Sequence, residues 1–158
     1  MVLLAILPVA CASEPPPLEP TFDSDEALAR VVLDLVERED REALLHLSIT
    51  KDEFEDIVWP TLPVSRPEVG MPLSYLWNDT FTKSRSYLAE TLSKFGGQRF
   101  ELVRVEFRGD TTEHETYSVS RKTHLVVRDE SGEERTVRLF GSVIRQDGRS
   151  KVYSYIID

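Results

Sequence analysis

Apolar residues recur at helical spacing through the first half of the chain. Asp23–Glu26 supplies the side-chain oxygens and early acidic charges that suit the start of a helix. A short second helix is expected over 41–47, and Thr50–Glu53 fits the capping box of a third helix that Pro60 ends. The apolar face of the first helix recurs at every third or fourth position, with Leu28, Val31, Val32, Leu35 and Val36.

A loop rich in proline separates these helices from a longer one. Residues 61–72 contain Pro63, Pro67, Gly70 and Pro72, which predicts irregular backbone. Loops of this length in a compact domain are often binding elements or lids. The next apolar positions, from Leu73 to Phe95, predict a helix of about six turns that Gly96-Gly97 terminates.

From residue 100 the apolar period changes to two, which predicts strands. The parity shift at Leu102-Val103 suggests a bulge or a strand buried on both faces, and Asp147-Gly148 predicts a hairpin turn. Because the strands follow one another directly, we expect an antiparallel sheet. It has four long strands, over 100–107, 117–128, 135–145 and 151–157.

Helices followed by strands predict an α+β fold, with the N-terminal helices packed on a curved four-stranded antiparallel sheet. The element order over residues 27–157 resembles the NTF2-like superfamily, which includes ketosteroid isomerases and SnoaL-type polyketide cyclases. The resemblance implies a bent sheet that wraps the long helix into a cone. The Pro-rich loop replaces short strands that many members have, and a cystatin-like sheet against one helix is the alternative.

The first residues have the pattern of an export signal. An apolar run, Val2–Ala10, ends at Cys11, and Leu7–Cys11 resembles the lipobox of bacterial lipoproteins. The resemblance implies cleavage before Cys11, a diacylglycerol on its thiol, and a place in the bacterial cell envelope, facing the periplasm or exterior. The alternative, cleavage at an A-x-A site formed by Ala10-Cys11-Ala12, would release a soluble secreted protein.

These features divide the chain into three parts. Residues 1–10 are the signal, 11–22 are the anchor cysteine with a Pro-rich tether, and 23–158 are one α+β domain. The apolar run is about half the roughly 20 residues that span a bilayer, so it predicts no transmembrane anchor. Beyond Cys11 the chain has no cysteine, so packing alone must stabilise the domain.

The net charge of -9 lies in the first half of the chain. Residues 1–98 carry 17 acidic and 8 basic side chains, whereas residues 99–158 carry 11 of each. Nucleic acids are bound through clustered Lys and Arg, so no nucleic-acid partner is expected. The acidic surface is interpreted as a solvated helix surface.

Catalytic chemistry has little support in the sequence. Asp79 is the best candidate for an inward acid, but it lies two residues from Trp77 and points about 200° away on a helix. His46, His114 and His124 are scattered over a short helix, a polar connection and an outer strand face. We therefore predict no catalytic residue, no metal and no cofactor.

Aromatic residues flank the Pro-rich loop and begin the long helix. In a cone-shaped domain this region would lie near the opening, so Trp59, Tyr75 and Trp77 are candidates for a ligand or partner surface. Arg121 is added because it occupies an inward position of its strand. The alternatives are plain core for Trp77 and an edge position or salt bridge for Arg121.

The sequence thus favours an exported, lipid-anchored, non-catalytic domain that binds a small apolar ligand or an envelope protein. One alternative is an NTF2-like isomerase, cyclase or hydrolase that uses a cavity carboxylate with a raised pKa. Another is an accessory subunit of an envelope assembly, with Phe140 and Ile144 exposed on one outer sheet face. A monomer and a homodimer both remain open.

Overall fold

A computed structural model describes residues 16–157, so the signal segment and Cys11 lie outside the described residues. The helices are α1 (Asp25–Glu37), α2 (Arg41–His46), α3 (Lys51–Glu53) and α4 (Leu73–Phe95). Three short turns connect α3 to α4, namely η1 (Phe54–Val58), η2 (Trp59–Thr61) and η3 (Pro63–Ser65). The strands are β1 (Glu101–Phe107), β2 (Thr111–Glu113), β3 (Ser118–Arg121), β4 (Thr123–Arg128), β5 (Glu134–Val137), β6 (Ser142–Gln146) and β7 (Arg149–Ser154).

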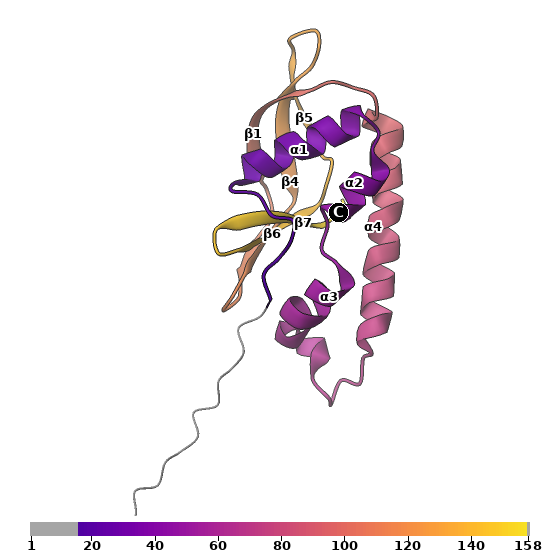
Figure 1. The fold of residues 1–158 in the computed structure, drawn as a ribbon, viewed down its shortest axis with the longest axis vertical. Coiled ribbons are helices and arrows are strands. Elements are labelled where there is room, and N and C mark those ends of the chain that lie inside the picture. The colour runs from indigo at the N-terminus through magenta and orange to yellow at the C-terminus, as the bar shows by residue number, and fades with distance from the viewer. Residues whose placement is uncertain (1–15, 158) are drawn as a thin grey trace, which may run out of the picture.

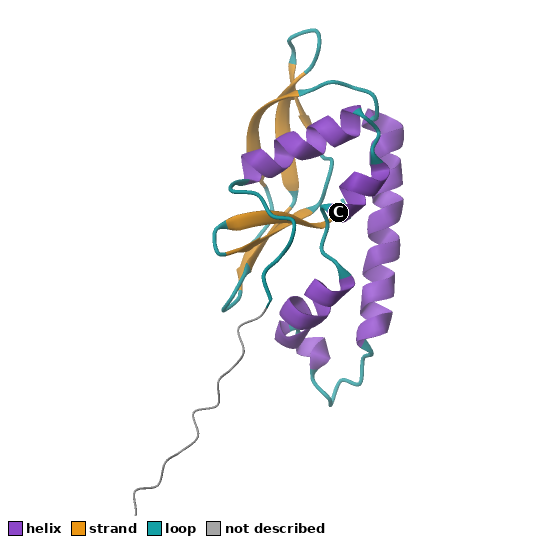
Figure 2. Ribbon diagram, in the orientation of Figure 1, coloured by secondary structure: helices purple, strands orange, loops and turns teal. Residues whose placement is uncertain are grey.

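The fold is α+β, as predicted, with helices beside two antiparallel sheets (Figures 1 and 2). One sheet has the order β1-β4-β5 and the other has the order β2-β3-β6-β7. Helix α1 lies across β1 and β4, while α4 runs along the side of the molecule (Figure 1). Within residues 16–157 no helix is long and apolar enough to cross a bilayer.

The predicted strand over 100–107 is confirmed as β1, but the predictions of single strands over 117–128 and 135–145 are wrong, because a bend divides them into β3 and β4 and into β5 and β6. Strand β2 is a further short strand that was not predicted. The bend falls at Gly109 between β1 and β2, at Lys122 between β3 and β4, and at Gly141 between β5 and β6. Lys122 has a φ of 56°, and a Cβ on Gly141 would lie 1.7 Å from the carbonyl oxygen of Ile156. Pairing continues across the bend, since Gly109 N–H donates to the Arg121 carbonyl at 3.2 Å.

Local sequence signals have the structures that they predict. Ser24 caps α1, and Thr50 and Glu53 form a reciprocal capping box at α3. Helix α4 ends at Phe95, directly before the two glycines. The β1–β4 register shifts between Leu102 and Arg104, which confirms the bulge, and both residues of the Asp147-Gly148 turn have a positive φ.

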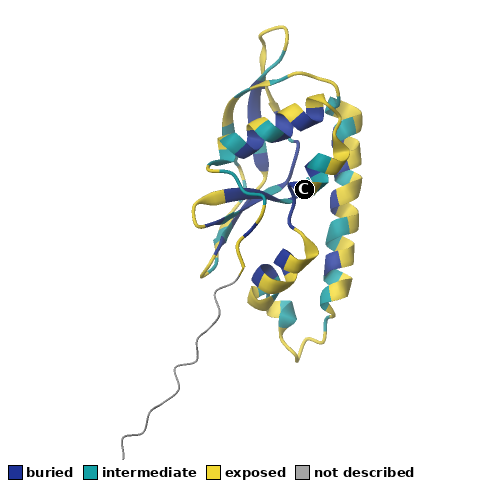
Figure 3. Ribbon diagram, viewed as in Figure 1, coloured by how far each residue is buried: buried dark blue, intermediate teal, exposed yellow. Residues whose placement is uncertain are grey.

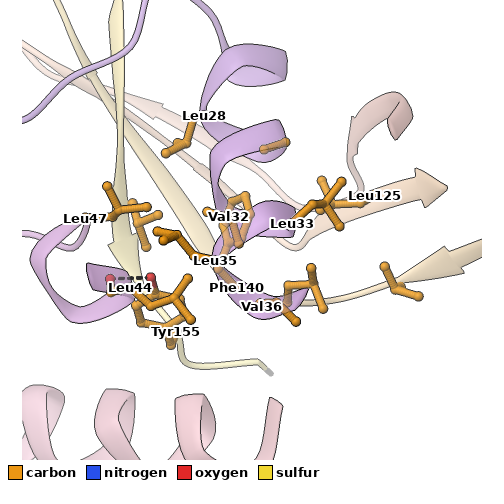
Figure 4. Packing of buried hydrophobic residues seen from close by; sticks show 14 of the residues in the cluster. Leu28, Val32, Leu33, Leu35, Val36, Leu44, Leu47, Leu125, Phe140 and Tyr155 are labelled. Carbon is orange, nitrogen blue, oxygen red and sulfur yellow. Dashed lines mark hydrogen bonds between the residues drawn. The ribbon is translucent and has the colours of Figure 1, made fainter. Parts of the chain in front are cut away.

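The larger core lies between the helices and the strands from β4 to β7. Apolar faces of α1 and α2 meet Leu88 of α4 and residues from β4 to β7. Figure 4 shows Leu28, Val32 and Leu44 pointing into this cluster, together with Tyr155. Tyr155 is fully buried, and its hydroxyl donates to the Leu44 carbonyl, as the dashed line marks.

A second core fills the space between η1, the first half of α4 and the four-stranded sheet. It contains Phe54 and Ile57 from the turn region, Trp77 from α4, and Ile144 from β6. Phe140 belongs to the first core instead. The prediction that Phe140 and Ile144 share an exposed face is therefore wrong. Both are buried, and the bend at Gly141 separates them, so that Phe140 packs in the first core and Ile144 in the second.

The segment Pro16–Phe22, which we call the N-terminal strap, lies against the domain. Leu18 is 3% exposed and packs in the second core. Phe22 pairs with Ser150 of β7 through two backbone hydrogen bonds of 2.9 and 2.8 Å. The described fold thus includes residues before Asp23 (Figure 3).

Candidate functional site

A groove lies between the C-terminal half of α4 and the end of β5. Its volume is about 360 Å³. Helix α4 forms one side of it, and the end of β5 together with Ile157 forms the other. The lining residues are Tyr87, Glu90, Thr91, Lys94, Phe95, Thr136, Val137, Arg138 and Ile157. We call this hollow the α4–β5 groove.

The buried residues that line the α4–β5 groove offer apolar surface, and the exposed residues at its rim are polar. Val137 is buried and Phe95 and Tyr87 are half-buried, so they offer carbon surface. Thr91 is 4% exposed, and its hydroxyl donates to the Leu139 carbonyl at 3.5 Å. Lys94 is exposed, and its ammonium lies 5.0 Å from the centre of the Phe95 ring. Such a lining suits an apolar ligand body with a polar edge.

A second, larger hollow of about 690 Å³ lies beside the N-terminal strap. Its walls are strap residues together with His46 and Arg149. The Arg149 guanidinium already donates to Thr21 and pairs with Asp23, so it holds the strap. The apolar wall comes from strap prolines, since the Leu18 side chain is turned into the core. The α4–β5 groove, with its aromatic walls, is therefore the stronger ligand site.

The structure separates the aromatic residues that the sequence singled out. Trp77 is 9% exposed and contacts the rings of Phe54 and Phe81 at 5.5 and 5.3 Å. It is a core residue, as its alternative interpretation proposed. Trp59 is half-buried against the same core, whereas Tyr75 is 66% exposed on α4. None of the three lines the α4–β5 groove.

Arg121 is exposed on β3 and lines neither the α4–β5 groove nor the hollow beside the N-terminal strap. Its guanidinium donates to the Thr112 hydroxyl of the neighbouring edge strand β2 at 2.6 Å. Arg121 is therefore not at an edge, because β3 lies between β2 and β6, and the partner of its guanidinium here is a hydroxyl instead of the helix carboxylate of the other alternative. Its positive charge acts on two tyrosines, Tyr117 and Tyr153, whose pKa values it tends to lower.

These tyrosines form a polar cluster that the sequence reasoning did not identify. The Tyr117 hydroxyl is 2.6 Å from the Thr61 hydroxyl, and its ring stacks on His114 at 4.3 Å. Burial raises the pKa of Tyr117, and it raises the pKa of Tyr153 to about 12. Both groups therefore keep their protons at neutral pH and act as hydrogen-bonding groups. The alternation of apolar and polar residues along the strands predicts that Tyr117 points inward, but it does not identify Thr61 in the loop as its partner.

A buried ion pair joins α3 to β7. Lys151 is fully buried, and its ammonium lies 2.8 Å from Oε1 of Glu53. Burial alone would raise the pKa of Glu53, but hydrogen bonds from Lys151, Thr50 and Glu19 lower it below the ordinary value. The capping box could locate Glu53, whereas no sequence signal marked Lys151 as its partner.

Within residues 16–157, neither Asp79 nor Glu53 has the character of the cavity acid that the NTF2-like resemblance implies. Asp79 is exposed and pairs with Lys83 at 2.7 Å on the outer face of α4. The pKa of the buried carboxylate, Glu53, is lowered, the opposite of the raised pKa expected of such an acid. Among residues 16–157, no three His, Cys, Asp or Glu side chains gather in a way that could hold a metal ion.

Comparisons with known proteins add no relative. No protein family, curated protein or solved structure matches this chain. The residues and their geometry therefore carry the functional argument.

Proposed function

We propose that the protein is an exported, lipid-anchored, non-catalytic domain that binds a small apolar ligand in the α4–β5 groove. The groove itself is the observation that carries the proposal. Its volume of about 360 Å³ lies in the range of small-molecule sites, roughly 300–1,000 Å³. Aromatic and aliphatic walls supply most of the binding free energy of such ligands through the burial of apolar surface.

The anchor and the fold family belong to the same proposal. The lipobox-like Leu7–Cys11 supports attachment of a diacylglycerol at Cys11, and two or three acyl chains give stable membrane binding. The sharply bent sheet beside α1, α2 and α4 supports an NTF2-like architecture over a cystatin-like one. A Cys11→Ser variant tests the anchor, because a chain that still partitions with membranes would contradict it.

Native mass spectrometry tests the ligand. The chain from Ala12 onward is purified gently from its expression host and measured before and after denaturation. Extra mass of a few hundred daltons that disappears on denaturation is the expected result for a small-molecule groove. A bare protein that also fails to bind the neutral apolar dye N-phenyl-1-naphthylamine would contradict the proposal.

A pair of tryptophan variants assigns binding to the groove. Thr136→Trp places a bulky ring at the rim of the α4–β5 groove, where Thr136 is exposed. Glu134→Trp is the matched control, since Glu134 is exposed on the same strand and does not line the groove. Loss of dye binding in Thr136→Trp alone supports the groove, and equal loss or retention in both variants assigns the dye elsewhere.

A protein partner is the second candidate function, and the loop before α4 favours it. Val69 is 50% exposed and Tyr75 is 66% exposed, and both lie where the chain turns into α4. A photo-crosslinking side chain at Tyr75 should capture an envelope protein in intact membranes, whereas the same group at Glu130 should not. Equal capture at both positions would indicate collision, not binding.

A further inference from the structure

The N-terminal strap is clamped to the domain by side chains from three separate elements. Gln146 at the end of β6 accepts from Leu18 N–H at 2.9 Å and donates to the Pro16 carbonyl at 3.4 Å. Glu53 accepts from Glu19 N–H at 2.8 Å, and Lys151 donates to the Glu19 carbonyl. The strap is therefore part of the folded domain from Pro16 onward.

Burial makes this clamp stronger than a surface contact. The Leu18 side chain is 3% exposed, and Gln146 is 7% exposed. Lys151, which holds the Glu19 carbonyl, is fully buried and paired with Glu53. Releasing the strap would expose Leu18 and break both of these hydrogen bonds of the buried Gln146 side chain, which is costly, while Glu53 and Lys151 would each lose one partner and keep each other. The point at which the chain leaves the domain is thus fixed beside Gln146.

A fixed exit point limits how far the domain can stand from an anchor at Cys11. Five residue steps separate Cys11 from Pro16, and an extended chain covers at most about 18 Å in five steps. The Pro-rich tether expected up to residue 22 is therefore too long, because the strap residues from Pro16 onward are held against the domain and do not act as a spacer.

We propose that the clamped strap holds the domain in one orientation on the lipid surface, with the β6–β7 turn toward the bilayer. This inference rests on the proposed lipid anchor. The turn residue Asp147 directly follows Gln146, so it lies beside the exit of the chain. The β4–β5 hairpin lies at the top of the molecule in Figure 1, whereas the β6–β7 turn lies lower, at its left side. The same orientation turns the C-terminal half of α4, and with it the α4–β5 groove, away from the lipid.

Two matched cysteine variants test the orientation in the full, exported and lipidated chain. Asp147 and Glu130 are both exposed acidic residues in hairpin turns. Lipid blocks the thiol of Cys11, the chain's sole cysteine, so Asp147→Cys or Glu130→Cys supplies the one reactive thiol for a neutral fluorophore. Each labelled protein is reconstituted into phosphatidylcholine vesicles that carry a nitroxide on a fraction of the headgroups.

The expected result is several-fold stronger quenching at Asp147→Cys than at Glu130→Cys. Equal quenching, or stronger quenching at Glu130→Cys, would overturn the orientation. Flotation of the vesicles separates the two proposals. Protein that floats but shows no difference contradicts the orientation alone. Protein that does not float contradicts the lipid anchor and the orientation with it.

Two further variants connect the orientation to the strap. A Gly-Ser insert of about twelve residues between Glu14 and Pro15 lengthens the spacer and leaves the clamp untouched, so quenching at Asp147→Cys should fall toward that at Glu130→Cys. Gln146→Ala removes two clamp bonds and should also reduce the difference. A difference that survives the insertion would overturn the role of the short spacer, whether or not Gln146→Ala folds.

Discussion

The buried pair of Glu53 and Lys151 allows a quantitative test of the structure. Glu53→Gln keeps the size of the side chain but removes its charge, which leaves the Lys151 ammonium buried with no opposite charge at 2.8 Å. It also replaces one of two oxygens that accept hydrogen bonds from Thr50 N–H at 2.7 Å and Glu19 N–H at 2.8 Å. One of these N–H groups must then lose its acceptor.

The expected loss in the free energy of unfolding is about 3–5 kcal/mol, the usual result of removing one partner from a buried pair. The lost backbone acceptor accounts for about 1–3 kcal/mol of it. Asp79→Asn is the matched control, because it breaks an ion pair of similar length, 2.7 Å to Lys83, on an exposed helix face. Little change is expected there, since water screens exposed pairs.

Guanidinium chloride unfolding at several pH values measures the effect. The pKa of Glu53 is lower in the folded than in the unfolded chain, so its carboxylate stabilises the fold above the ordinary value of 4.5. That contribution is lost as the pH falls through the lower folded-state pKa. The difference in the free energy of unfolding between the native chain and Glu53→Gln should therefore have its full size at pH 7 and should become smaller below pH 4.5.

A double-mutant cycle with Lys151→Met completes the test. Each single variant leaves one buried charge uncompensated, whereas the double variant contains neither charge. The loss of unfolding free energy in the double variant should therefore be clearly smaller than the sum of the losses in the two single variants. A loss below about 1 kcal/mol for Glu53→Gln, or strict additivity in the cycle, would refute the buried pair.

Three further outcomes are expected. Gly141→Ala forces a Cβ to within 1.7 Å of a backbone carbonyl oxygen, so it should cost about 3 kcal/mol in urea unfolding, well above Gly109→Ala, whose Cβ would lie 3.0 Å from its nearest neighbour. Ser84→Ala removes the hydroxyl that accepts from the buried Tyr155 N–H at 2.9 Å, so it should lower the free energy of unfolding by about 1–3 kcal/mol. The raised pKa of Tyr153 stabilises the fold below pH 10, and this contribution is lost as the pH rises toward about 12. Tyr153→Phe should therefore make thermal stability less dependent on pH between these values.

Features set by near neighbours could be predicted from the sequence. The Ser24 cap, the Thr50–Glu53 capping box and the Asp147-Gly148 turn each depend on residues within one turn of chain. The bend of the sheet could not be predicted in the same way. It depends on Gly109, Lys122 and Gly141, which lie side by side on neighbouring strands. The alternation of apolar and polar residues along one strand does not show which residues of the other strands lie beside it.

The candidate site shows the same division. Alternation and helical spacing placed Trp77 on an apolar face, but they could not distinguish a cavity wall from a packed core. The α4–β5 groove joins Phe95 to Val137, which are far apart in the sequence. No pattern in the sequence marks Lys151 as a buried charge. The group that compensates this charge, Glu53, lies in a helix 98 residues earlier, so the pair cannot be recognised from near neighbours.

The strap has one more consequence, which concerns the edge of the sheet. Strand β7 is an edge strand, and unpaired strand edges can recruit strands of other molecules. Phe22 pairs with Ser150, and Ser48 pairs with Val152, so both bridges cover this edge within the same chain. A chain cut before Asp23 would lose the first bridge and leave the edge uncovered beside Ser150, so we expect such a chain to self-associate more readily than one that keeps the strap.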